Sequence, residues 1–396
     1  MTESEYDVVV AGHICVDILP DLSQVKLNSP SDFFRPGALV QTGAATTSTG
    51  GPVSNTGLNL VKMGVRTALM GKIGTDAFGK IVPDMIRAYG GVADGMIVDP
   101  EVSTSYTVVL TPAGYDRMFL HNPGANNTFG ADDIDYDLVK KAKLFHLGYP
   151  PLMKRMYEND GEELATIFRR VHEMGVTTSL DMAIPDPESD AGRANWRAIL
   201  EKTLPHVDIY LPSAEETLYM LEPARFMEWR SKTDGDLLPL FTGDDMHWMS
   251  DALLGYGAKI VGIKSGHRGY YIRTASEKAL RSITSAPPAD PAAFADRELW
   301  YPTYHIEGHP NATGSGDSSI AGFLATYLRG KTLEECMIRA TATGACNVQF
   351  PDALTGVKSW DDLTAILDAG WETDPLEITG EGWEQNEPAE HFWTRK

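Results

Sequence analysis

The chain has 396 residues, of which 42% are hydrophobic, and a formal net charge of −21 from 55 acidic and 34 basic residues. This composition suits a globular protein with a sizeable core, and the acidic balance argues against nucleic acid or an anionic membrane surface as a partner. No apolar run reaches the roughly 18 residues that a membrane span needs. Three cysteines without metal-ligand spacing and the acidic, polar start MTESEYD predict a cytoplasmic protein.

The first predicted strand covers residues 7–11, a β-branched apolar run with the sequence DVVVA. Asp17 lies shortly after it, where ligands bind in open α/β sheets, although an ordinary turn residue fits the pattern equally well. Residues 20–49 are irregular, and 42–49 (TGAATTST) are typical of an exposed strand or loop.

A glycine pair opens the next element. Gly50 and Gly51 precede a predicted helix from Pro52 to about Met63, which carries Asn55 in its first turn. A predicted strand over 67–73 follows and leads into the glycine-rich stretch GKIGTDAFG at 71–79.

Part of that stretch also matches the beginning of a P-loop. Gly74 to Lys80 fits G-x-x-x-x-G-K, but Ile81 stands where a Ser or Thr hydroxyl would bind Mg²⁺. We therefore disfavour the P-loop interpretation.

Residues 103–121 read as two strands around a turn at 112–114, either in a small lid or as an edge hairpin of the main sheet. Arg117, beside this turn, could face substrate in a lid, although an Arg there is usually solvated. Further on, strands alternate with helices, which implies βαβ units and a mostly parallel sheet. The predicted elements are strands at 143–147, 176–181, 208–211 and 258–264, a helix at 162–174, a helical insertion at 222–250 and a surface loop at 284–298.

The stretch HPNATGSGD, from His309 to Asp317, is chemically the most informative. Gly314 and Gly316 permit a tight turn and a close approach of a ligand to backbone N–H groups. A helical pattern from 318 to 329 follows at once, so unpaired N–H groups and the positive end of the helix dipole face the same space. This combination predicts an anion site with Asp317 at its mouth, placed to take a proton from a hydroxyl group. A plain helix cap is the alternative.

These motifs resemble the signatures of the ribokinase-like (PfkB) carbohydrate kinases. Residues 311–317 resemble D-T-x-G-A-G-D, with Asn311, Ala312 and Ser315 as departures, and residues 50–55 and 71–79 resemble G-G-x-x-x-N and G-x-x-G-x-D-x-x-G. Two weaker motifs after predicted strands resemble N-x-x-E and K/T-x-G-x-x-G, although polar and glycine-rich strand ends are common in any fold. They are residues 213–216 (SAEE) and 264–269 (KSGHRG).

The resemblance covers roughly residues 7–365 and implies one ribokinase-like domain over 1–396. Its fold would be an α/β three-layer sandwich with a mostly parallel central sheet and a small β lid from 15–48 and 103–125. Residues 366–396 would form an acidic C-terminal extension, which we expect to wrap the surface. The small residues Ala340, Ala342, Gly344 and Ala345, in a helix predicted to reach about Val348, would let a flat ligand or another helix approach.

The implied activity is ATP-dependent transfer of the γ-phosphoryl group to a hydroxymethyl group of a small-molecule sugar, with ATP and Mg²⁺ as cofactors and a monovalent cation such as K⁺ as a further candidate. A homodimer through the lid is a candidate assembly. The resemblance implies catalytic roles for Asp317 as base with Gly314, Ser315 and Gly316 as anion hole; substrate contacts from Asp17, Gly50, Gly51 and Asn55; nucleotide contacts from Ser213, Lys264, Gly266, Gly269 and Asn347; and Mg²⁺ binding by Glu216 and, through water, Asp181.

Other interpretations stay open. A nucleoside (adenosine-type) kinase would share the fold, and a catalytically silent sugar- or nucleotide-binding regulator fits the departures at Ser213, Asn311 and Ala312. Pro52, where ribose-specific members often carry Lys, disfavours ribose. A metal site formed by the residues at 305–309 (HIEGH) lacks further ligands and is disfavoured.

Overall fold

The structure is a computed structural model that describes residues 4–25, 36–37, 39–112, 118–308, 311–386 and 391–396. Within this part of the chain, eleven strands form the main sheet: β1 Tyr6–Gly12, β4 Thr67–Ile73, β5 Val92–Val98, β8 Ala142–Gly148, β9 Thr177–Leu180, β10 Ile209–Tyr210, β11 Ile260–Lys264, β12 Tyr270–Thr274, β13 Glu298–Tyr301, β14 Trp383–Gln385 and β15 Trp393–Arg395.

The sheet order is β14-β15-β13-β12-β11-β10-β9-β8-β1-β4-β5. From β5 to β11 every neighbouring pair is parallel, and from β11 to β14 every pair is antiparallel. The predicted α/β fold with a mostly parallel central sheet is therefore confirmed.

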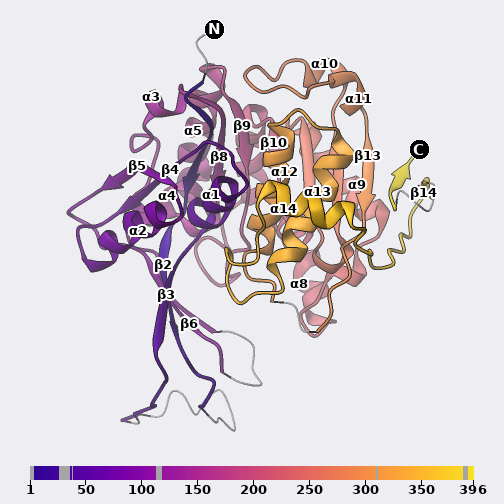
Figure 1. Cartoon of the computed structure of the whole chain (residues 1–396). Helices are drawn as coiled ribbons and strands as arrows, with labels where there is room; N and C mark the ends of the chain where they lie inside the picture. Colours follow the sequence, from indigo (N-terminus) through magenta and orange to yellow (C-terminus); the bar gives the residue numbers. More distant parts are fainter. Residues whose placement is uncertain (1–3, 26–35, 38, 113–117, 309–310, 387–390) are drawn as a thin grey trace.

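Helices cover both faces of this sheet: α1 Pro52–Lys62, α2 Ala77–Ala88, α3 Tyr136–Val139, α4 Lys154–Tyr157, α5 Glu162–Glu173, α6 Trp196–Thr203, α7 Ala214–Leu221, α8 Pro223–Ser231, α9 Gly243–Gly255, α10 Glu277–Leu280, α11 Pro291–Phe294, α12 Ser315–Tyr327, α13 Leu333–Asn347 and α14 Trp360–Asp368. In Figure 1, α1, α12, α13 and α14 lie in front of the sheet.

The alternation of side chains along β1 explains the three layers. Successive residues of a strand point to opposite faces, and Val8 and Val10 pack in one apolar cluster with α1, α12 and α13, whereas Val9 and Ala11 pack in a second cluster with α5 to α9. All four side chains are fully buried. An uninterrupted apolar run is what a strand covered on both faces requires.

A second, four-stranded sheet in the order β3-β2-β6-β7 projects from the body, at the bottom of Figure 1. Its strands are β2 Cys15–Pro20, β3 Ala45–Gly50, β6 Tyr106–Leu110 and β7 Met118–Asn122. The predicted hairpin at 103–121 is confirmed as β6 and β7, and it belongs to this small sheet rather than to the main one. Arg117 and the tip of the hairpin lie outside the described residues.

The helix at the anion-site motif starts earlier than the sequence pattern predicts. We expect it at Ser318, but α12 begins at Ser315, because Gly314 takes a left-handed conformation (φ 68°) and accepts a hydrogen bond from the Ser318 N–H at 2.9 Å. Ser315, Gly316 and Asp317 thus form the first turn of the helix. The amide groups expected in a loop therefore belong to a helix N-terminus, where the Ser315 N–H donates to the Ala312 carbonyl at 3.2 Å.

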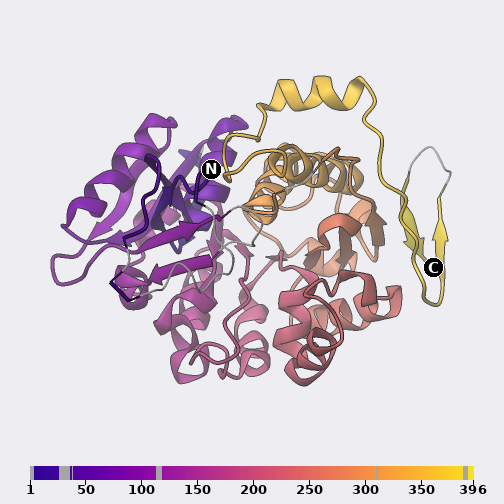
Figure 2. The ribbon, with the colours of Figure 1, turned by 90° about the horizontal axis from the view of Figure 1, so that it is seen from below.

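The C-terminal extension also differs from expectation, since it adds strands to the main sheet. β15 pairs with β13, placing Trp393 opposite Trp300, and β14 pairs with β15. Trp383 packs on Trp300 with ring centroids 6.1 Å apart, so burial of aromatic surface holds this hairpin. Figure 2 shows it at the edge of the molecule far from the N-terminal strands. The expected loop at 284–298 likewise contains a short helix, α11.

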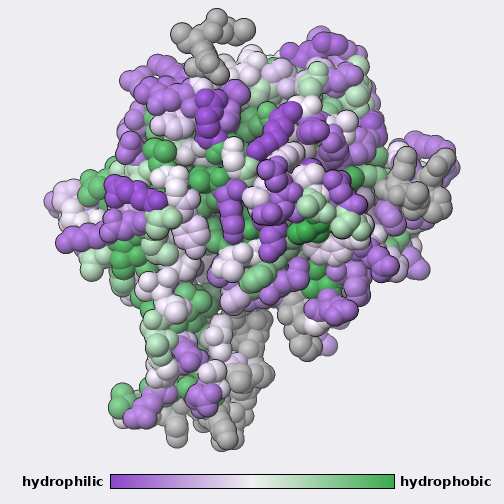
Figure 3. Space-filling model, viewed as in Figure 1, coloured by the Kyte–Doolittle hydropathy of each residue, from purple (hydrophilic) through white to green (hydrophobic). Residues whose placement is uncertain are grey.

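The visible surface mixes hydrophilic and apolar side chains. The face in Figure 3 is largely hydrophilic, with apolar side chains scattered over it. Among the described residues, no helix is long and apolar enough to cross a membrane.

Candidate functional site

The N-terminus of α12 lies at the centre of the predicted site residues. Gly314 must be glycine there: besides its positive φ, an added Cβ would lie 2.2 Å from Cβ of Ala353. The atoms nearest to a Cβ on Gly316 would be those of the Lys264 side chain, at 3.4 Å or more. The first turn of α12 therefore lies directly beside a cation, as suits an anion-binding helix terminus.

Asp317, in that first turn, is 1% exposed. Its Oδ2 accepts hydrogen bonds from Nδ2 of Asn55 at 2.9 Å and from the Tyr149 hydroxyl at 2.8 Å, and its Oδ1 accepts one from Thr56 at 3.3 Å. Burial raises the pKa of Asp317, and these hydrogen bonds oppose the rise. The carboxylate is thus fixed in one orientation by neutral donors.

A second group of charges lies beside Asp317. Nζ of Lys264, at the end of β11, is 2.5 Å from Oδ1 of Asp181, which follows β9, and it also donates to the Leu211 carbonyl at 2.7 Å. Burial raises the pKa of Asp181, as do the carboxylates of Glu216 and Asp317, while Lys264 lowers it. Three carboxylates and one ammonium group therefore lie close together at the carboxyl ends of parallel strands, where ligands bind in such sheets.

Glu216 stands in the first turn of α7. Its Oε2 accepts a hydrogen bond from the Ser213 N–H at 2.6 Å, and the Ser213 hydroxyl caps the Glu216 N–H, a capping box. Asp181 Oδ2 is buried without a hydrogen-bond partner among the described residues. These acidic oxygens suit a hard cation that is also held by phosphate, the usual environment of Mg²⁺. No group of three or more ligating side chains close enough to hold a metal by itself occurs in the described chain.

The predicted substrate residues gather where the small sheet joins the body. Asp17 on β2 lies against Gly50 of β3, where an added Cβ would be 2.4 Å from its Oδ2. Gly51, with φ 87°, caps α1, and a Cβ there would be 2.5 Å from Nδ1 of His13. Gly51 is required by its positive φ and by its close approach to the His13 backbone, whereas a Cβ on Gly50 would meet the carboxylate end of the Asp17 side chain. Burial raises the pKa of Asp17.

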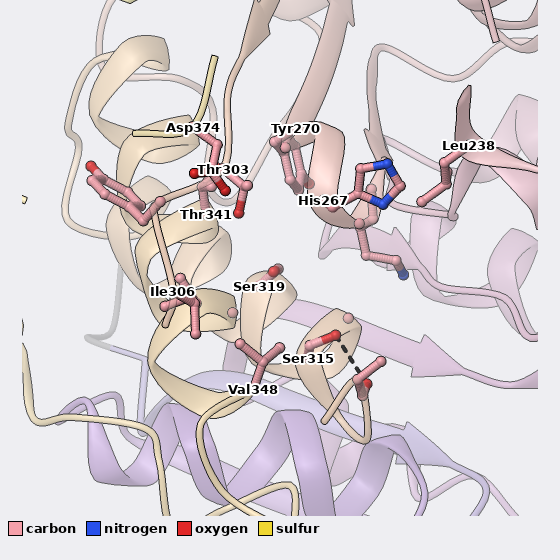
Figure 4. A pocket seen from close by; sticks show the side chains of 18 residues that line it. Leu238, His267, Tyr270, Thr303, Ile306, Ser315, Ser319, Thr341, Val348 and Asp374 are labelled. Carbon is pink, nitrogen blue, oxygen red and sulfur yellow. Dashed lines mark hydrogen bonds between the residues drawn. The ribbon is translucent and has the colours of Figure 1, made fainter. Parts of the chain in front are cut away.

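A cavity of about 360 Å³ opens on the other side of the α12 terminus (Figure 4). Of the predicted nucleotide residues, Lys264, Gly266 and Gly269 line it, together with Ser315 and Gly316, whereas Ser213 and Asn347 do not. Asn347 instead donates to the Thr313 carbonyl at 2.8 Å and so supports the loop before α12. Of the small residues on α13, Gly344 and Ala345 line the cavity and Ala340 and Ala342 do not.

Sequence reasoning missed two residues of this site. Tyr149 directly follows β8, so its place after a parallel strand was a usable signal; its backbone is left-handed, with φ 62°. His13 directly follows β1 and is 3% exposed, and neither of its ring nitrogens has a hydrogen-bond partner among the described residues. Burial lowers the pKa of His13 to about 3, helped by His121.

The geometry does not support the P-loop or the metal site that the sequence disfavours. The Gly74 N–H donates to the Thr104 hydroxyl, and Asp76 caps α2, so this loop anchors the hairpin rather than cradling a phosphate. His305 pairs with Asp374 at 2.7 Å instead of with a metal-ligand set, and His309 lies outside the described residues.

Comparison with known proteins defines the class. The family model described as pfkB family carbohydrate kinase matches residues 7–360, so the chain belongs to that family. An uncharacterized sugar kinase of Archaeoglobus fulgidus is 26% identical over 280 residues, 70% of this chain and 90% of that protein. A probable chloroplastic fructokinase-6 of Arabidopsis thaliana is 29% identical over 223 residues, 55% of this chain and 53% of that protein.

Solved structures share the fold. Arabidopsis thaliana ribokinase complexed with ribose and ATP superposes with a TM-score of 0.67 at 18% identity, covering 91% of this chain and 98% of the ribokinase. A candidate ribokinase II from E. coli, in complex with ATP and Mg²⁺, superposes with a TM-score of 0.64 at 20% identity, covering 92% of this chain and 99% of the E. coli chain. The ribokinase-like fold is therefore established for this chain.

Proposed function

We propose that the protein is an ATP-dependent kinase that transfers the γ-phosphoryl group of ATP to a hydroxymethyl group of a sugar. The observation that carries this proposal is Asp317, a buried carboxylate in the first turn of α12, between a cavity with a lysine and the base of the small sheet. Phosphoryl transfer requires positioning, charge neutralisation and a proton acceptor, and this arrangement offers a residue for each.

In the proposed mechanism, the sugar hydroxyl approaches Asp317 from the side of Asn55. Two neutral donors occupy Oδ2, so Oδ1, held only by the longer Thr56 contact, takes the hydroxyl proton. The N–H groups of Gly314 and Gly316 would stabilise the negative charge of the transferred phosphoryl group, and the Ser315 N–H, which donates to the Ala312 carbonyl at 3.2 Å, would have to turn to the phosphoryl group to join them. Lys264 adds a positive charge beside them.

When bound, Mg²⁺ would neutralise phosphate charge. Glu216 would hold it, with Asp181 acting through water, and the unpartnered Asp181 Oδ2 supports this assignment. Lys264 and Gly266 and Gly269 would contact the nucleotide, with Ser213 and Asn347 acting indirectly as the cap of α7 and the support of the 313 loop. A monovalent cation remains a separate prediction.

On the acceptor side, Asp17, Gly50, Gly51 and Asn55 would contact the sugar. A neutral His13 beside Gly51 offers one donor and one acceptor, which matches a hydroxyl group better than a carboxylate or phosphate. Because the relatives include fructokinases, D-fructose is the first acceptor to test.

The small sheet would act as a lid over the sugar, within 15–48 and 103–125 of a single kinase domain, and 366–396 as an extension of that domain. Its edge strand β7 exposes Phe119 (57%) and Leu120 (50%), which supports a homodimer through the lid. Three free, buried cysteines fit a cytosolic enzyme.

The deciding experiment is to incubate the protein with ATP, Mg²⁺ and a panel of sugars and nucleosides while measuring ADP release. We expect a neutral sugar such as D-fructose to stimulate release in the wild type and not in Asp317→Asn. Stimulation by nucleosides alone would indicate a nucleoside kinase, and no stimulation by any acceptor would favour the silent regulator.

A further inference from the structure

The C-terminal segment 371–374 forms part of the cavity beside α12, although it lies beyond residues 7–360 that match the family model. It is docked on the chain that follows β13: the Asp374 N–H donates to the Thr303 carbonyl at 2.8 Å, and the His305 N–H donates to the Glu372 carbonyl at 2.8 Å. The Trp371 ring stacks on Tyr304, with centroids 4.7 Å apart. Backbone pairing and stacking thus fix the segment's position.

Asp374 is the residue of this segment that lines the cavity. Figure 4 shows it near Thr303 and Thr341, at the end opposite Ser315. Its Oδ1 lies 2.7 Å from Nδ1 of His305, and its side chain is 39% exposed. An ionised carboxylate accepts hydrogen bonds and cannot donate them.

Thr341 adds a second acceptor at this end. Its hydroxyl donates to the Met337 carbonyl at 2.9 Å, so its single hydrogen is used and only its lone pairs are left for a ligand. Gly344 and Ala345 on the same helix leave room for a flat group. This end of the cavity therefore suits a planar ligand whose edge carries hydrogen-bond donors.

We propose that Asp374 accepts a hydrogen bond from the 6-amino group of adenine in the phosphoryl donor and so favours adenine over a purine that has no donor at position 6. The inference rests on the proposed kinase function, which places the phosphates at Ser315 and Gly316 beside Lys264 and hence the base at the Asp374 end. The 6-amino group of adenine donates, whereas a purine with hydrogen at position 6 has no donor there. The C-terminal extension would then be a specificity element of this chain.

The test compares ADP with purine riboside 5′-diphosphate, which differs only at position 6, by equilibrium binding to the full chain in the presence of Mg²⁺. One hydrogen bond to a partly exposed carboxylate should make ADP bind about tenfold more tightly. Asp374→Ala should bind both nucleotides equally, with the affinity for the purine analogue unchanged. Asp374→Asn, which keeps an acceptor oxygen, should retain part of the preference.

Glu372→Ala is the matched control, because it removes one negative charge from the same segment at an exposed position outside the cavity lining. It should keep the wild-type ratio, and circular dichroism will show whether each variant is folded. Equal binding of both nucleotides by the wild type, or an unchanged ratio in Asp374→Ala, overturns the inference and leaves the kinase proposal intact. Failure of the wild type to bind either nucleotide overturns both.

Discussion

The two sides of Asp317 are built from different chemistry. On the side of the small sheet, the groups around Asp317 are neutral, and the carboxylate of Asp17 lies on the small sheet itself: Asn55 and Tyr149 fix Asp317 by hydrogen bonds, and His13 is a buried, neutral imidazole. On the cavity side, Lys264 balances the carboxylate of Asp181. The first side fixes the orientation of the Asp317 carboxylate. The second side holds charged groups whose contacts a nucleotide phosphate would change, so substitutions on the two sides should have different consequences.

Asp317 belongs to both sides, and its replacement should have the largest effect. Asp317→Asn keeps the size and can still accept from Asn55, but it cannot take a proton. We expect kcat with the best acceptor of the panel to fall by about 10²–10⁴-fold, with the melting temperature and the Kd for ADP nearly unchanged. A near-normal kcat would rule out Asp317 as the base, and an unfolded variant would favour a purely structural role for its hydrogen bonds.

Lys264→Met tests the charged side through stability. It leaves Asp181, 1% exposed, without its cationic partner, and breaking such a buried pair typically costs about 3–5 kcal/mol. The control is Lys264→Met with Asp181→Asn, which should recover much of the free energy of unfolding in urea. Equal destabilisation of the single and double variants would mean that the ion pair is not the cause.

The loss of stability in Lys264→Met should also depend on pH. Burial already raises the pKa of Asp181 in the folded state, and loss of Lys264 raises it further. A carboxyl group whose folded pKa exceeds its unfolded pKa stabilises the fold when protonated and loses that contribution as pH rises. The deficit of Lys264→Met should therefore grow from acidic toward neutral pH, and a pH-independent deficit would contradict this explanation.

Tyr149→Phe tests the neutral side and should have a smaller effect. The Tyr149 hydrogen bond lowers the pKa of Asp317, so its loss should raise that pKa further. Because the base must be ionised to act, the acidic limb of kcat/KM should move to higher pH. Lys264, Asp181, Glu216 and Asp17, the other charged groups of the site, are unchanged in this variant. A lower kcat with an unshifted limb would indicate a packing role only.

Much of the architecture could be predicted because it depends on local patterns. The apolar run at 7–11 indicates a buried strand in any fold. The glycine pair before α1 indicates the start of a helix that packs closely against its neighbours. Asp317 and Lys264 were predictable for a similar reason, since each lies at the end of a regular element. Family signatures then gave their order along the chain.

Contacts between distant segments could not be predicted in this way. The bond from Tyr149 to Asp317 joins residues 168 positions apart, and no local pattern encodes it. The strands of the C-terminal extension are three residues each, too short for a periodic signal, and they form because Trp383 and Trp393 find partners on β13. The early start of α12 likewise depends on the single left-handed residue Gly314.

The smallest expected effect concerns the small sheet itself. Its strands β2 and β6 pair in parallel over three residues and connect to the body near His13. There, the Asn126 side chain accepts a hydrogen bond from the Ile14 N–H and donates one to the Ile14 carbonyl. The base of the sheet is therefore rigid, while its far end makes few contacts with the body, as Figure 1 shows.

If this sheet closes over the acceptor, hydrogen exchange at β2, β3, β6 and β7 should slow severalfold with D-fructose or the best acceptor of the panel. ADP alone should instead protect α12 and the turn at 264–269. Protection of the small sheet by ADP and not by the acceptor would reverse the assignment of the two sides, because the neutral side would then be the one that responds to the nucleotide.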